Sequence, residues 1–150
     1  MYAHQINTMI YRDAKTAFHY LGVFPANKIP NYMPPNSCAI INNKNHYEMG
    51  EHWIALHMNR NDVLEFYDSY GMNANFYKLT RKLPRHRRIL YNKRHLQHLL
   101  STVCGYYCLH FLYYKTRGYT LSYVNRNFCR DQNSNDNYVY YKTKQLYDIT

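Results

Sequence analysis

The chain has 150 residues, of which 46% are hydrophobic and 17% aromatic, so it can bury a core and fold as one domain over 1–150. Its formal net charge of +10 favours polyanionic partners such as nucleic acid, although charge alone does not select among them. No apolar run approaches the roughly 18 residues of a membrane span, and the N-terminal stretch "MYAHQINTMIYRDAK" lacks the apolar core of a signal peptide. We therefore expect no membrane association and no secretion.

The first half of the chain predicts one helix and then three strands. Residues 13–21 place four apolar side chains at helical spacing, and Gly22 can end that helix. Four of the five prolines fall in 24–36, which predicts an extended or turning connection, and "CAIIN" after it is typical of a short buried strand. The runs "HWIALHMN" and "VLEFYDSYG" alternate as strands do, so we expect them to form a hairpin around Arg60.

The second half predicts mainly helices. Residues 72–90 are expected to hold a helix followed by a basic connection. The apolar stretch Cys104–Lys115 predicts a buried helix that stops at Gly118, and 134–149 opens with good N-cap residues and predicts a closing helix. The mixture indicates an α+β fold, in which a small central mixed sheet is flanked by helices.

The four cysteines are expected to be free thiols because nothing in the sequence indicates secretion. Cys104 and Cys108 are separated by three residues, and His110 and Cys129 follow. This spacing lacks the paired ligand cassettes of structural zinc sites, so we expect no metal site. Cys108 is interpreted as a core thiol that lies one turn deeper in its helix than Cys104.

Cys104 has a second interpretation, as a nucleophile. A nucleophilic thiol needs a general base, a group that orients the base, and donors for the oxyanion. His52 at the start of one strand, Asp68 at the end of the next and Gln97 before the helix could supply these groups. Cys104 would lie at an exposed helix N-terminus, where orphan N–H groups stabilise a thiolate, and Gly105 would allow a close approach. Each residue also has an ordinary structural explanation, such as a buried thiol, a surface histidine or a turn-forming aspartate.

The hairpin register decides whether His52 can meet Asp68. A three-residue loop over 59–61 would set Met58 opposite Asp62, and hence His52 opposite Asp68 on the same face. A two-residue turn would place the two side chains on opposite faces. The catalytic interpretation therefore predicts an odd-length loop or a compensating bulge.

The order of these blocks resembles the adenain family, which comprises the adenovirus maturation proteases and relatives in polinton-like elements, and more distantly the ubiquitin-like-protein (SUMO) proteases. The resemblance covers roughly 20–118 and rests on "YLGVFPANKIPNYMPPNSCAIINN", "MGEHWIAL", "LEFYDSYG" and "LQHLLSTVCGYYCLHF". It implies a catalytic triad of His52, Asp68 and Cys104, with Gln97 in the oxyanion hole. The nucleophile would begin a buried helix. The substrate cleft would include Gly50, Glu51, Trp53 and Gly105.

The resemblance implies a monomeric cysteine endopeptidase that cleaves near small or glycine residues and matures viral or virus-like structural precursors. Such an enzyme would work in the virion and the host nucleus, or at an intracellular site of virus assembly. Its chemistry needs no cofactor. A peptide activator stays open, but the cysteine that tethers it in adenovirus enzymes has no counterpart between Asp68 and Gln97.

The segment "RKLPRHRRILYNKRH" is strongly basic. It is either a solvated surface segment, such as a nuclear localisation signal, or a patch that follows phosphates. Family members use viral DNA as a cofactor, so the resemblance favours sequence-tolerant binding of double-stranded DNA. The candidate residues are Arg81, Lys82, Arg85, Arg87, Arg88, Lys93 and Arg94. Two alternatives remain at this point: a protease or isopeptidase acting on ubiquitin-like proteins, and a non-catalytic basic structural protein that binds DNA.

Overall fold

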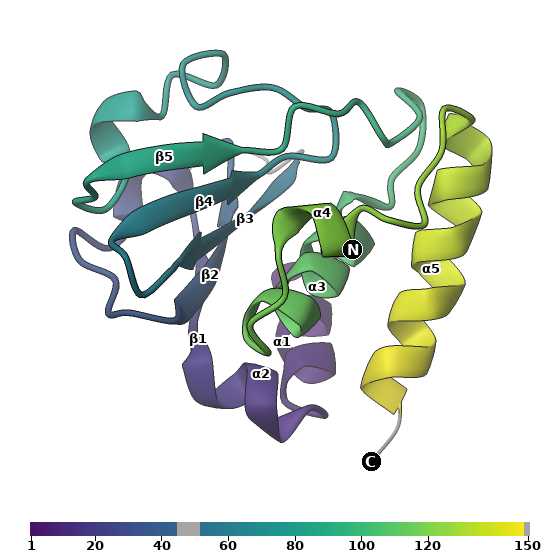
Figure 1. Ribbon diagram of the computed structural model, residues 1–150, viewed down its shortest axis with the longest axis horizontal. Coiled ribbons are helices and arrows are strands. Elements are labelled where there is room, and N and C mark those ends of the chain that lie inside the picture. The colour runs from purple at the N-terminus through teal and green to yellow at the C-terminus, as the bar shows by residue number, and fades with distance from the viewer. Residues whose placement is uncertain (45–51, 149–150) are drawn as a thin grey trace.

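The computed structural model describes residues 1–44 and 52–148, and a five-stranded sheet forms one side of it (Figure 1). The strands follow chain order across the sheet: β1 Tyr20–Phe24, β2 Ser37–Asn42, β3 Trp53–Met58, β4 Val63–Tyr67 and β5 Arg88–Tyr91. The outer pairs β1–β2 and β4–β5 are parallel, whereas β2–β3 and β3–β4 are antiparallel. The expected α+β architecture with a small mixed sheet is therefore confirmed.

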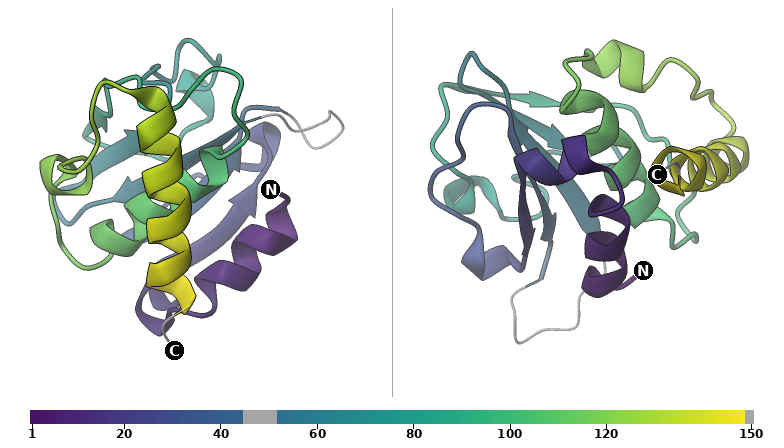
Figure 2. Two further views of the ribbon diagram at one scale, coloured as in Figure 1. Left: turned by 90° about the vertical axis from the view of Figure 1, so that its right-hand side faces the viewer. Right: turned by 90° about the horizontal axis from the view of Figure 1, so that it is seen from below.

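Helices cover one face of this sheet. They are α1 Ala3–Ile10, α2 Ala14–His19, α3 Cys104–Lys115, α4 Leu121–Val124 and α5 Gln132–Asp148, and short 3₁₀ turns occur at Ala26–Lys28 and Thr80–Lys82. Helix α3 lies between the sheet and α5, packing against β3 on one side and α5 on the other (Figures 1 and 2). Among the described residues, no helix is both long and apolar enough to cross a lipid bilayer.

The sheet is buried on both faces, and β2 shows how. Cys38 and Ile40 belong to the core shared with the helices, whereas Ala39 and Ile41 belong to a second core on the opposite face. Loop residues such as Met33 fill that second core. Because successive strand residues point to opposite faces, a strand covered on both sides is continuously apolar, as "CAIIN" is.

Helix α3 begins and ends at the residues that the sequence predicts. Nearly all of its side chains are buried, because the sheet and the other helices enclose it. His110 is an unusual member of this core: it contacts the rings of Tyr114, Phe128 and Tyr138, and neither ring nitrogen has a partner among the described residues. Burial, together with the positive charges of neighbouring basic residues, lowers the pKa of His110 to about 3.

Two expected helices are wrong in extent or type. The helix predicted over 13–21 ends at His19, because the next residues form β1 and pair with β2. Phe18, expected on its buried face, is 84% exposed. Residues 72–90 hold no α-helix: turns, a 3₁₀ turn and the edge strand β5 occupy the segment. At the end of α2, strand pairing between β1 and β2 replaces the local helical preference.

The β3–β4 hairpin has the predicted parity but not the predicted register. Met58 pairs with Leu64 instead of Asp62, so five residues, 59–63, separate the paired positions. An odd loop keeps the side chains of His52 and Asp68 on the same face, offset diagonally rather than directly opposite. The Asn59 side chain stabilises this longer loop, because its oxygen accepts the backbone N–H groups of Asn61 and Val63.

Candidate active site

Three of the predicted catalytic residues lie where secondary-structure elements begin or end. His52 directly precedes β3, Asp68 directly follows β4, and Cys104 is the first residue of α3. Because β3 and β4 are antiparallel, the start of one and the end of the other share one end of the sheet. Helix α3 packs on β3, which brings Cys104 to that same end.

Asp68 holds the His52 ring through a buried hydrogen bond of 2.6 Å between Oδ1 and Nε2. The carboxylate also accepts the backbone N–H groups of Tyr70 and Met72 and the hydroxyl of Tyr77, the last at 2.7 Å. Both carboxylate oxygens are therefore fixed from several directions. Since Nε2 is engaged by Asp68, Nδ1 of His52 is left to face a third partner.

Two tyrosines line the His52 ring. Tyr70 stacks on it with centroids 4.7 Å apart, and Tyr77 lies parallel at 5.8 Å. The tight turn after Tyr70 requires a glycine at position 71. Gly71 has a φ of 76°, and a Cβ added there would lie 2.8 Å from the Arg94 backbone. Sequence reasoning missed both tyrosines. Tyr70 could have been noticed beside Asp68, but nothing in the sequence marks Tyr77.

The electrostatics favour an ion pair between Cys104 and His52. Burial alone would raise the pKa of the Cys104 thiol, but hydrogen bonding to His52 and the positive charge of that ring lower it below its usual value. Burial alone would lower the pKa of His52, but hydrogen bonding to Asp68 and Cys104 raises it to about 9. This arrangement favours a Cys104 thiolate beside a His52 imidazolium.

Cys104 is less accessible than the sequence suggested. It is 7% exposed, so the prediction of an exposed helix N-terminus is wrong, whereas Cys108 is buried in the core as expected. The N-terminal residue contributes to the burial: the Met1 side chain packs against Gly105, and the Met1 carbonyl accepts the Trp53 indole N–H at 2.9 Å. Trp53 thus lies beside the site. The predicted cleft residues Gly50 and Glu51 fall outside the described residues.

Gln97 is buried and firmly held. Its Oε1 accepts the Ser69 hydroxyl at 2.5 Å, and its Nε2 donates to the Ser101 carbonyl and hydroxyl oxygens at 3.2 and 3.0 Å. An amide nitrogen carries two hydrogens, and both have an acceptor on Ser101 here, so Gln97 would have to release one of them to serve an oxyanion. Ser69 directly follows Asp68 in the chain, so the hydrogen bond from Ser69 to Gln97 connects the glutamine to the residue beside the acid. The role of Gln97 as an oxyanion donor remains a prediction.

The seven basic residues predicted to bind DNA do not share one environment. All seven are exposed, and they lie along the 3₁₀ turn, the edge strand β5 and the residues on either side of β5. Arg94 is engaged internally, because its guanidinium donates to the backbone carbonyls of Asn125 and Phe128. Charged side chains also protect an edge strand from pairing with other chains, so exposure alone does not indicate a ligand.

All four cysteines are free thiols. Within the described part of the chain, no group of three or more His, Cys, Asp or Glu side chains could hold a metal ion.

Comparison with known proteins gives a structural likeness but no sequence relative. No family model matches the chain, and no curated protein matches it. The crystal structure of the ASFV pS273R protease matches 78% of this chain with a TM-score of 0.51 at 19% identity. The central domain of an uncharacterized protein, Lpg1148 from Legionella pneumophila, covers 86% of this chain and 88% of its own length at 13% identity, with a TM-score of 0.46.

The likeness to the ASFV protease establishes a shared fold. This chain spans 46% of the length of that protease chain.

Proposed function

We propose that this chain is a cysteine endopeptidase of the adenain type. The observation that carries the proposal is the buried Asp68–His52 pair, which lies against a Cys104 thiol of lowered pKa at the start of α3. A fold shared with a viral protease supports it. A thiolate, a protonated histidine and a fixed carboxylate are the groups that acyl transfer needs.

In the proposed mechanism, the Cys104 thiolate attacks the carbonyl carbon of the scissile peptide bond. The oxyanion accepts the backbone N–H of Cys104, one of the orphan donors of the helix N-terminus, and an N–H of Gln97 that turns from Ser101 toward the oxyanion. The His52 imidazolium then gives its proton to the leaving amine, and the C–N bond breaks. A water molecule, deprotonated by His52, hydrolyses the thioester and regenerates the thiolate. Asp68 holds the ring throughout.

Cys104 is 7% exposed in this structure, so we propose that an activating partner widens access to it and supplies the free energy for that rearrangement. We propose double-stranded DNA for this role, bound without sequence preference by the exposed basic residues before, within and just after β5. The proposed substrates are viral or virus-like structural precursors, cleaved near small or glycine residues.

The decisive experiment is covalent labelling with a chloroacetamide reagent at low salt, with and without duplex DNA. We expect one label, located at Cys104 by peptide mass spectrometry, faster labelling with DNA, and hydrolysis of glycine-containing peptides by the same preparation. Cys104→Ala should abolish the fast phase, whereas Cys129→Ala, which removes an exposed thiol, should retain it. Equal labelling of the Cys104→Ala protein would exclude this nucleophile.

A protease or isopeptidase acting on ubiquitin-like proteins is the second candidate, because the same residues would serve it. A reactive probe built on the C-terminus of a ubiquitin-like protein discriminates between the two. Capture of Cys104 by this probe, together with no cleavage of glycine-containing capsid-type peptides, would favour the second candidate. A non-catalytic DNA-binding protein would show neither reaction but would still bind duplex DNA.

A further inference from the structure

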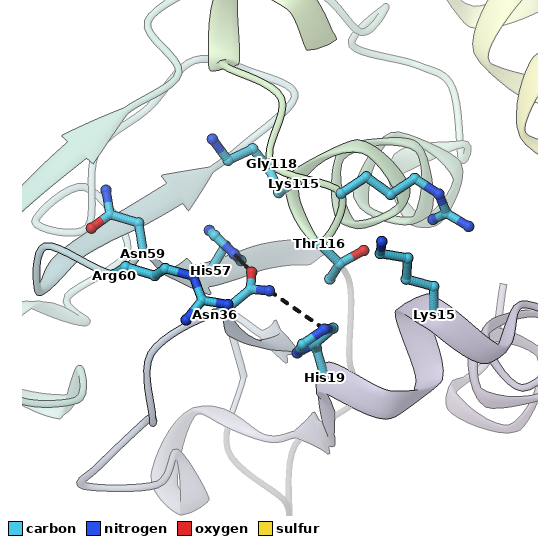
Figure 3. A pocket seen from close by; sticks show the side chains of 10 residues that line it. Lys15, His19, Asn36, His57, Asn59, Arg60, Lys115, Thr116 and Gly118 are labelled. Atoms are coloured by element: carbon cyan, nitrogen blue, oxygen red, sulfur yellow. Dashed lines mark hydrogen bonds between the residues drawn. The ribbon is translucent and has the colours of Figure 1, made fainter.

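A second polar site lies at the other end of α3. A pocket of about 370 Å³ opens between the end of α2, the β3–β4 loop and the residues that follow α3 (Figure 3). Helix α3 has 12 residues, so at 1.5 Å per residue this pocket is roughly 16 Å along the helix from Cys104. It is therefore separate from the candidate active site.

The pocket lining is basic. Lys15, Arg60, Lys115 and Arg117 contribute to it, and none of the described residues that line it is acidic. Two of these cations are already neutralised: Lys115 pairs with the buried Glu65 at 2.8 Å, and Arg117 pairs with Asp13 at 2.7 Å.

Lys15 and Arg60 are different, because neither has a hydrogen bond or ion pair to another described residue. They come from α2 and from the hairpin loop, so they flank the pocket from two elements (Figure 3).

The polar side chains that line the pocket between Lys15 and Arg60 are held in place by hydrogen bonds to one another. Asn36 lies between two histidines, with its Oδ1 2.8 Å from His57 Nε2 and its Nδ2 3.4 Å from His19 Nε2 (Figure 3). His57 is held in turn by Glu65 at 2.7 Å through its Nδ1. Asn36 adopts a left-handed backbone with φ of 60°, a conformation uncommon outside glycine.

The free groups of this pocket are donors. The Asn59 side-chain oxygen already accepts two backbone N–H groups, so its amide N–H₂ points elsewhere. The His19 Nε2 is taken by Asn36, which leaves its Nδ1. Burial lowers the pKa of His19, and the positive charges of His57, Arg60 and Lys15 lower it further, so the ring lies in a positive field.

Such a pocket selects a ligand that carries several acceptors and negative charge. We propose that it binds the phosphate groups of a small phosphorylated molecule, a phosphate monoester or polyphosphate. Lys15 and Arg60 would clamp the phosphate oxygens by charge, and the Asn59 amide would donate the directional hydrogen bond. The volume suits a small molecule rather than a bare ion.

The test is calorimetric titration of the full chain with tripolyphosphate, pyrophosphate and inorganic phosphate, at ionic strength held constant with chloride. We expect tripolyphosphate to bind most tightly and to shift the Asn59 side-chain amide signals in ¹H–¹⁵N spectra. Loss of a charge-assisted contact typically weakens binding by about tenfold or more, so Lys15→Gln/Arg60→Gln should lose at least that much affinity.

The matched control is Lys28→Gln/Arg130→Gln, which removes the same charge from exposed positions outside the pocket and outside the proposed DNA-binding segment. It should change the tripolyphosphate affinity by less than about twofold, because these residues can act only through screened charge. Equal weakening in the two variants would overturn the proposal, since binding would then follow net charge. So would the absence of tripolyphosphate binding combined with duplex DNA binding that depends on Lys15 and Arg60. No outcome depends on protease activity.

Discussion

Two histidine–carboxylate pairs lie at opposite ends of the β3–β4 hairpin. His52 bonds Asp68 at 2.6 Å, and His57, five residues further along the chain, bonds Glu65 at 2.7 Å. Both pairs are buried. They differ in the third partner, which is the Cys104 thiol in the first and the Lys115 ammonium in the second.

The third partner sets what each pair can do. A thiol can lose its proton, so the His52 ring lies between two groups that are negative when ionised and its pKa rises to about 9. At the other end, burial would raise the pKa of Glu65, but His57 and Lys115 lower it below its usual value. In the proposed mechanism the first cluster transfers protons, whereas the second holds charge, although the bond lengths are nearly equal.

The largest contrast should come from removing each histidine. We expect His52→Ala to slow peptide hydrolysis by about 10⁴-fold, because it removes the general base and acid. His57→Ala should leave the rate within about threefold and cost roughly 1–3 kcal/mol of unfolding free energy, since a buried hydrogen-bond partner is lost. Steady-state rates and urea denaturation measure the two effects. A large rate loss in folded His57→Ala protein would remove the distinction between the two clusters.

Glu65→Ala should be the most destabilising change at the basic end. It leaves the buried Lys115 charge without its counter-ion, which typically costs about 3–5 kcal/mol. The matched control is Asp148→Ala, which breaks an exposed pair with Arg12 and should cost less than about 1 kcal/mol. Equal losses of unfolding free energy in the two variants would show that Glu65 does not stabilise the buried charge of Lys115.

Gln97→Ala should lower kcat by about 10²–10³-fold, which is the usual effect of removing one oxyanion donor. Ser69→Ala should have a smaller effect, because it loosens the amide without deleting it. The exposed Gln145→Ala provides the control and should leave kcat unchanged. An unchanged kcat in Gln97→Ala would show that Gln97 has only a structural role.

The smallest expected effect concerns Tyr77 and pH. Activity should rise as Cys104 ionises below its usual pKa and should fall as His52 loses its proton near pH 9. Tyr77→Phe removes a donor from Asp68, which leaves more negative charge facing His52 and raises the pKa of that ring. The alkaline limb of the pH–rate profile should therefore shift to higher pH, and the rate itself should change by less than about tenfold.

The exposed Tyr141→Phe serves as its control and should leave the pH profile unchanged. A downward shift of the alkaline limb in Tyr77→Phe would contradict this reading of the Asp68 site.

Local pattern was sufficient for the elements that carry their own signal. β2, β3, β4, α3 and α5 could be located from apolar runs, strand alternation and N-cap residues. The short edge strands β1 and β5 could not, because their stability comes from pairing with neighbours that are distant in sequence.

The candidate site, like the fold, could be predicted only in part from the sequence. The parity of the hairpin loop could be deduced from the requirement that His52 meet Asp68, but a positive-φ residue, Asp62, and the Asn59 cap make the loop two residues longer than expected. The network around the site was not predictable, since Tyr77 and Ser101 reach it only through the folded path of loops.

His110 limits the conditions under which this protein can be handled. Its ring is neutral in the folded chain, with a pKa of about 3, but binds a proton near pH 6.5 once the chain unfolds. Acidification below pH 6.5 therefore draws the equilibrium toward the unfolded chain, and the loss continues until the pH reaches the folded value. A leucine at this position would remove the proton site and widen the range of buffers in which the protein can be purified and stored.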